Sequence, residues 1–73
     1  MNNINMIPVS SSNVAKIGYE ESTNTLRVEF LDGSLYDYSG VPQPEFYNLK
    51  NASSVGGYLN SNIKGVYKYK KVR

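Results

Sequence analysis

Hydrophobic and polar residues alternate along three short stretches in the first half of the chain. Apolar residues occupy every second position in residues 14–19 and 26–30, and a third stretch follows at residues 35–38. A period of two residues is typical of a strand with one buried face. Polar residues at 21–24 and an Asp-Gly pair at 32–33 separate the stretches and predict turns. The pattern therefore predicts three consecutive strands.

The turn at residues 32–33 allows two registers for the hairpin around it. A two-residue loop would place Tyr36 and Tyr38 on the charged face of the preceding strand. A three-residue loop, with the glycine in the left-handed conformation, pairs Tyr36 with Val28 and Tyr38 with Leu26. We prefer the second register because it keeps the apolar side chains on one face. Tyr36 and Tyr38 are then expected in the core, with their hydroxyl groups at its rim.

Prolines interrupt the alternation after residue 41 and introduce a helix. Pro44 suits the first turn of a helix, and a glutamate beside it suits the positive end of the helix dipole. The helix is predicted to run to about Ala52. Phe46 and Leu49 are expected on its buried side, with Tyr47 as a further candidate.

The remainder of the chain predicts a second short helix and a last strand. Ser53 or Ser54 can cap the helix, and Lys64-Gly65 resembles a helix end. Residues 66–72 alternate again and predict a strand. The expected fold class is α+β, with a small antiparallel sheet of three N-terminal strands plus a C-terminal strand. Two short helices lie between strands three and four, in the order βββααβ. Residues 1–7 are expected to be a flexible N-terminal segment, and residues 8–73 a single domain.

The composition narrows the chemistry that 73 residues can support. The chain has neither cysteine nor histidine, so disulfides and the common zinc sites are excluded. Asp37, between two tyrosines on a strand, is expected to be a solvated charge that pairs across the sheet. We therefore expect no enzyme activity, no cofactor and no metal. No stretch approaches the about 20 apolar residues that span a bilayer, and no secretory signal is evident, so a cytoplasmic location without membrane association is expected.

The positive charge of the chain is concentrated near its C-terminus. Residues 1–63 hold three basic and all six acidic side chains, whereas residues 64–73 hold five basic side chains and no acid. If Tyr67 and Tyr69 point inward, Lys68 and Lys70 form an outward basic row, about 7 Å apart, near the phosphate spacing of a nucleic-acid strand. Alternatively, these lysines protect an edge strand from aggregation.

Four segments together resemble the KTSC domain, which is named after the C-terminus of some lysyl-tRNA synthetases and also occurs as small bacterial and phage proteins. The segments are residues 8–13, 36–38, 54–60 and 63–69. The resemblance covers residues 8–72 and implies RNA binding, as the synthetase context suggests. Two positions depart from the family pattern: Leu59 replaces a common aromatic residue, and Lys64 replaces an arginine. These departures remove one stacking surface and one bidentate donor.

The charge pattern and the resemblance together predict a small non-catalytic binding module. The expected RNA contacts are the basic residues Lys64, Lys68, Lys70, Lys71 and Arg73 and the tyrosines Tyr58, Tyr67 and Tyr69. Two alternatives remain open. One is a protein-interaction or adaptor module, including a homodimer that uses an exposed sheet edge. The other is a small-nucleotide pocket formed by Ser10, Ser11 and Ser12 with Asn60 and the tyrosines. The serine run is otherwise a turn that satisfies its own backbone.

Overall fold

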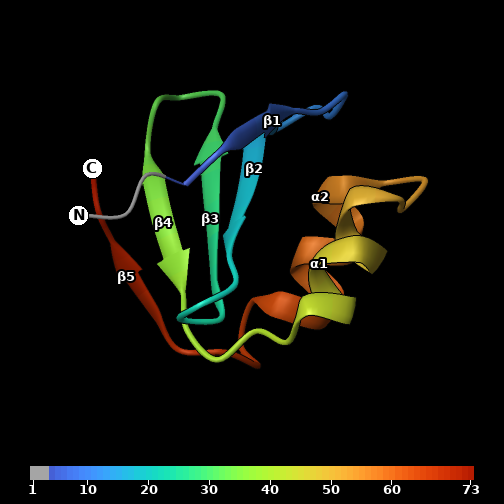
Figure 1. Cartoon of the computed structure of the whole chain (residues 1–73). Helices are drawn as coiled ribbons and strands as arrows, with labels where there is room; N and C mark the ends of the chain where they lie inside the picture. The colour runs from blue at the N-terminus through green and yellow to red at the C-terminus, as the bar shows by residue number, and fades with distance from the viewer. Residues whose placement is uncertain (1–3) are drawn as a thin grey trace.

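The computed structural model describes residues 4–73 and has a five-stranded antiparallel sheet with helices packed on one of its faces (Figure 1). The sheet order is β1-β2-β3-β4-β5, which is the order of the strands in the chain. The strands are β1 (Met6–Pro8), β2 (Val14–Glu20), β3 (Thr25–Phe30), β4 (Leu35–Tyr38) and β5 (Tyr69–Lys71). The helical elements are α1 (Gln43–Lys50), α2 (Val55–Tyr58) and the π-helical turn η1 (Leu59–Ile63).

The register of the β3–β4 hairpin is the one that the sequence predicts. Tyr36 pairs with Val28 and Tyr38 pairs with Leu26. Gly33 takes a left-handed φ of 91° and donates its N–H to the carbonyl of Phe30, which closes the three-residue loop. Tyr38 is buried, as expected, whereas Tyr36 is only half-buried.

The strand count before the helices differs from the prediction. Four strands precede the helices instead of three, because β1 pairs with β2 in a segment that the sequence interpretation divided between a flexible terminus and a turn. A strand of three residues that ends in proline has no alternation from which it can be recognised. Residues 1–3, the start of the segment expected to be flexible, lie outside the described residues.

The position of β1 depends on a close approach to Gly18 in β2. A Cβ atom on Gly18 would lie 2.6 Å from Cγ2 of Ile4 and 2.7 Å from the carbonyl oxygen of Asn5 and Sδ of Met6. Gly18 itself is buried. The N-terminal segment therefore crosses the sheet where the missing side chain leaves room.

The helices follow the predicted positions with different bounds. Phe46 and Leu49 are buried on α1 as expected, but Tyr47 is 48% exposed, so its predicted burial is wrong. Ser54 caps α2, since its Oγ accepts the N–H of Gly57. Together with residues of β2, β3 and β4 and with Val41 in the loop after β4, these helices enclose a core of eleven buried hydrophobic residues among those described.

The C-terminal strand is shorter than the alternation suggests. The strand β5 covers Tyr69–Lys71, not the predicted 66–72. The amides of Val66 and Tyr67 both donate to the carbonyl of Ile63, so the chain is still turning at these residues. An alternating pattern cannot distinguish such a turn from an extended segment.

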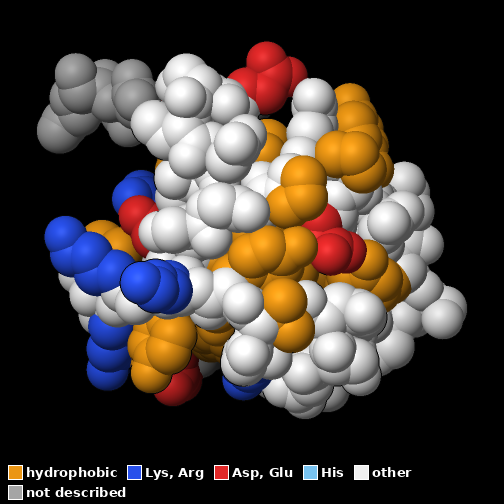
Figure 2. Space-filling model, turned by 90° about the horizontal axis from the view of Figure 1, so that it is seen from below, with side chains coloured by type: hydrophobic (Ala, Val, Ile, Leu, Met, Phe, Trp, Pro, Cys, Tyr) orange, Lys and Arg blue, Asp and Glu red, His pale blue; other side chains and the backbone are white. Residues whose placement is uncertain are grey.

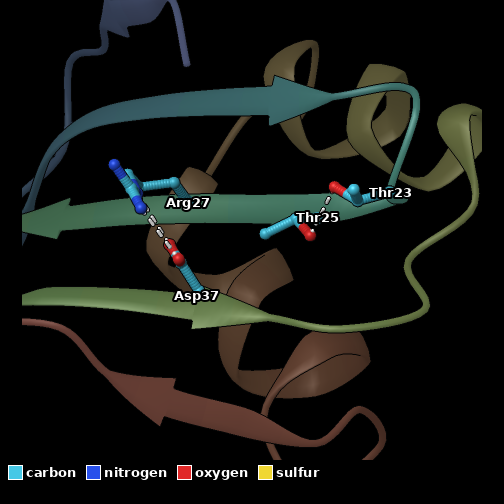
Figure 3. A network of polar contacts seen from close by, with 4 residues as sticks. All are labelled: Thr23, Thr25, Arg27 and Asp37. Carbon is cyan, nitrogen blue, oxygen red and sulfur yellow. Dashed lines mark hydrogen bonds and ion pairs between the residues drawn. The ribbon is translucent and has the colours of Figure 1, made fainter. Parts of the chain in front are cut away.

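The opposite face of the sheet, which the helices do not cover, carries paired charges. Arg27 on β3 donates to both carboxylate oxygens of Asp37 on β4, at 2.7 and 2.9 Å (Figure 3). A hydrogen bond between the hydroxyl groups of Thr23 and Thr25 lies nearby. The predicted role of Asp37 as a charge that pairs across the sheet is therefore confirmed.

We predict that Gly18→Ala lowers the free energy of unfolding by about 1–3 kcal/mol, because the added methyl group overlaps the segment that leads into β1. Urea unfolding measures this change. Lys16→Ala, at an exposed position of the same strand, is the control and should change stability by less than about 0.5 kcal/mol. An unchanged midpoint for Gly18→Ala would contradict the close approach.

Candidate nucleic-acid interface

A cleft of about 410 Å³ opens between the end of the β3–β4 hairpin, β5 and the loop after η1. Its aromatic lining consists of Phe30, Tyr36, Tyr38 and Tyr69. Its remaining lining consists of Asp32, Ser34, Lys64 and Gly65. Apolar walls with a few polar groups at defined positions are typical of ligand sites.

The aromatic residues of the cleft form a continuous surface. The ring of Tyr36 lies 5.5 Å from that of Phe30, edge to face, and 5.6 Å from that of Tyr69. Tyr38 lies 5.9 Å from Tyr69. Tyr69 is 64% exposed, although one side of its ring packs against Tyr36 and Tyr38. The surface is thus anchored in the core at Tyr38 and open to a ligand at Tyr69.

Lys64 brings a positive charge to the cleft. The π-helical turn ends where the amide of Lys64 donates to the carbonyl of Leu59. From there Nζ of Lys64 reaches a point 5.3 Å from the ring centroid of Phe30. A cation over an aromatic face is attracted by the ring quadrupole. The cleft therefore combines stacking surfaces with a cation that can meet a phosphate.

Asp32 supplies a fixed negative group at the cleft. Its Oδ1 accepts the hydroxyl of Ser34 at 2.7 Å and the backbone N–H of Ser34 at 2.9 Å. These hydrogen bonds, with a smaller contribution from the charge of Lys71, hold the pKa of Asp32 below its ordinary value. The side chain is therefore an ionised acceptor at neutral pH.

The predicted basic residues of the C-terminus are divided between the two faces of the sheet. Lys71 pairs with Tyr36 and so shares the cleft face with Tyr69, whereas Lys70 pairs with Asp37 on the opposite face. The guanidinium of Arg73 lies 3.7 Å from the carboxylate of Glu29, which is also on that opposite face.

Lys68 is exposed just before β5 and is held there by its backbone, because its carbonyl accepts the amide of Ser39. This hydrogen bond continues the β4–β5 pairing by one residue, so Lys68 lies opposite Ser39 and on the same face as Lys70, as the predicted basic row requires. The Lys and Arg side chains gather at the β5 side of the molecule when it is seen from below (Figure 2).

Tyr58 and Tyr67 have a shared partner that the sequence does not reveal. Both hydroxyl groups donate to the carboxylate of Glu45 on α1. This contact raises the pKa of Tyr58, and burial followed by the same contact raises the pKa of Tyr67. Neither ring lines the cleft. The two tyrosines connect α1, α2 and the segment that leads to β5.

The serine run is a turn that binds its own backbone. Oγ of Ser11 accepts the amides of Asn13 and Val14. Ser12 lines a smaller hollow of about 300 Å³ that shares Phe30 and Asp32 with the cleft, whereas Ser10 lines neither.

Asn60, which the nucleotide alternative places beside the serines, is exposed on η1 and lines neither of these hollows. Sequence reasoning missed Phe30, Asp32 and Ser34 as site residues. The hairpin register was the one signal in the sequence for Phe30, because it places this residue on the same face as Tyr36.

Within residues 4–73, no helix is long and apolar enough to cross a membrane. The same residues contain no group of three acidic side chains that could hold a metal ion, in a chain without histidine or cysteine.

The fold and the cleft define a small α+β domain with a five-stranded antiparallel sheet and an aromatic site at the edge formed by β5. The family model described as the KTSC domain matches residues 10–72. The chain therefore belongs to the KTSC domain family.

Its relatives are of two sizes. A lysine–tRNA ligase from Nostoc punctiforme is 36% identical over 92% of this chain, which spans only 12% of that protein. An uncharacterized protein from Stutzerimonas stutzeri is 34% identical over 80% of this chain and 82% of its own length. The crystal structure of a KTSC domain protein from Yersinia pestis superposes with a TM-score of 0.91 at 33% identity, covering 97% of this chain and all of that one.

We predict that Glu45→Gln lowers stability by about 1–3 kcal/mol, because two hydroxyl groups lose a charged acceptor. The pKa values of Tyr58 and Tyr67 should also fall towards the ordinary 10.0, which ultraviolet titration of tyrosinate measures.

The pH dependence of stability has a definite sign. A tyrosine whose pKa is raised by folding stabilises the native state below pH 10.0, and this stabilisation is lost as the pH rises through the folded pKa. The wild-type protein should therefore lose more stability above pH 10.0 than Glu45→Gln does. Equal alkaline losses would contradict the role of Glu45.

Proposed function

We propose that this KTSC domain is a non-catalytic module that binds single-stranded RNA at the aromatic cleft. The observation that carries the proposal is the exposed ring of Tyr69, which continues a surface of buried and half-buried aromatic rings and lies on a strand with two lysines. Sequence-tolerant binding of single strands combines such stacking surfaces with a positive groove.

Stacking is the first element of the proposal. A base that lies on Tyr69 extends into the cleft towards Tyr36, whose ring is already held by Phe30. The protein thus presents a preformed surface, which reduces the entropy lost when a base binds.

Phosphate attraction is the second element. Lys64 lies in the cleft lining, and Lys71 lies on the same face as Tyr69. In this proposal these two lysines contact the RNA backbone. Lys68 and Lys70 lie on the opposite face, where Arg73 also reaches Glu29, and these residues add only to the general positive field.

The relatives favour RNA as the ligand. Proteins named lysine–tRNA ligase contain a segment 36–37% identical to most of this chain. Because the name of these ligases includes tRNA, we expect their matching segment to lie in a protein that meets RNA.

Fluorescence anisotropy with a short mixed-sequence RNA tests the stacking element. Tyr69→Ala should weaken binding about 5- to 140-fold, which corresponds to the loss of about 1–3 kcal/mol for one stacked base. Tyr47→Ala is the matched control, because Tyr47 is a similarly exposed tyrosine on α1 and lines a different hollow. Equal losses in the two variants would contradict a role for the cleft.

The salt dependence of the same titration tests the phosphate element. Lys64→Ala should reduce the slope of log K against log salt concentration by about 0.7, the value for one lost phosphate contact with a single strand. Lys50→Ala is the control, because Lys50 also lies over aromatic rings but on α1. If the wild-type protein binds no RNA at ~50 mM salt, where electrostatic affinity is high, the proposed function is wrong.

A further inference from the structure

The aromatic cleft has a polar group that stacking and phosphate attraction do not use. The carboxylate of Asp32 lines the cleft between Phe30 and Ser34, on the loop that joins β3 to β4. A binding site that served only to attract phosphates would be weakened by a negative charge at this position. Asp32 accepts two hydrogen bonds from Ser34 within the hairpin loop, and the same carboxylate places a negative charge at the cleft.

Only one oxygen of this carboxylate is engaged. The two hydrogen bonds from Ser34 both end on Oδ1, and Oδ2 accepts no hydrogen bond from the residues that the structure describes. The Ser34 contacts also fix the orientation of the carboxylate group. Oδ2 is thus an available acceptor on an oriented carboxylate, and its residue lines both the aromatic cleft and the smaller hollow beside it.

From this arrangement, and resting on the proposed RNA binding, we infer that the cleft selects bases that carry an exocyclic amine and that Asp32 accepts a hydrogen from that amine. Adenine, cytosine and guanine each have such a donor. The corresponding position of uracil is a carbonyl oxygen, which an ionised carboxylate repels. RNA-binding proteins commonly read the Watson–Crick edges of unstacked bases in this way.

The geometry also limits how far the selection goes. Guanine offers two neighbouring N–H groups that pair best with two free carboxylate oxygens, but Oδ1 of Asp32 is already shared with Ser34. A single free oxygen recognises an amine without distinguishing the bases that carry one. The expected order is therefore cytosine and adenine above uracil.

A cationic ligand is the other chemistry that suits aromatic rings and a carboxylate. Lys64 already occupies the face of Phe30 with its own ammonium group, and Lys71 lies close enough to influence Asp32. The positive charges of Lys64 in the cleft lining and of Lys71 on the same face favour a ligand that carries phosphates with its ring. The charge distribution therefore supports a nucleotide.

The test compares short oligomers of cytidine, adenosine and uridine by fluorescence anisotropy at ~50 mM salt. The wild-type protein should bind the cytidine and adenosine oligomers about tenfold more tightly than the uridine oligomer, the lower end for a hydrogen bond to a charged group. Asp32→Asn places an amide donor at Oδ2 while keeping an acceptor for Ser34. This variant should lose the preference for cytidine and adenosine and favour the uridine oligomer, because the amide donates to the uracil carbonyl and not to an amine.

Glu21→Gln is the matched control for the loss of one negative charge. Glu21 is exposed in the turn between β2 and β3, at the opposite end of β3 from Asp32. Its substitution should raise the affinity for all three oligomers by the same small factor and preserve the tenfold preference. If Asp32→Asn does not fold, an oligomer of N4,N4-dimethylcytidine with the wild-type protein gives the same information, because it lacks the amine hydrogens and should bind as weakly as uridine.

The outcomes separate the inference from the proposed function. Equal wild-type affinity for all three oligomers overturns base selection and leaves RNA binding in place. If Asp32→Asn still prefers the cytidine and adenosine oligomers to the uridine oligomer, the role of Asp32 is overturned. The same holds if the dimethylated oligomer binds the wild-type protein as tightly as the cytidine oligomer. No binding of any oligomer overturns the proposed function itself.

Discussion

The register of the β3–β4 hairpin is the constraint on which the rest of the structure depends. Pairing Tyr36 with Val28 and Tyr38 with Leu26 gives the central strands one apolar face, against which the helices pack. A slip by one residue would turn both tyrosines to the charged side of Arg27. The same register places Phe30 beside Tyr36 and turns Asp32 towards the cleft. The core and the candidate site therefore have a common origin.

The cleft also depends on contacts made far from it in the sequence. Glu45 accepts hydrogen bonds from the hydroxyl groups of Tyr58 and Tyr67. These two tyrosines lie before and after Lys64 in the chain, so both sides of the Lys64 segment are held against α1. Because the chain has no cysteine and therefore no disulfide, the small net stability of a domain of this size depends on contacts of this kind. The exposed end of the site, Tyr69, can then remain available to a ligand without loss of the core.

Much of the sheet was predictable because apolar and polar residues largely alternate in β2, β3 and β4 and because recognisable turns join these strands. The helix positions followed from Pro44, Ser54 and the spacing of Phe46 and Leu49. The strand β1 was not predictable, since its three residues lack a pattern and are positioned by the space above Gly18. The candidate site was predicted in part, through Tyr69 and Lys64, whereas Tyr58 and Tyr67 turned out to contact Glu45.

The sequence by itself determined the local preferences: which stretches are extended, where helices begin, which register keeps one face apolar, and that no histidine or cysteine chemistry is available. The tertiary structure decided which side chains meet. Lys64, Asp32 and Tyr69 belong to three separate segments and form one cleft only because β5 adds to β4 and η1 ends beside the hairpin. Periodicity reports the direction of a side chain within its own segment, and it carries no information about the partner that packing brings to it.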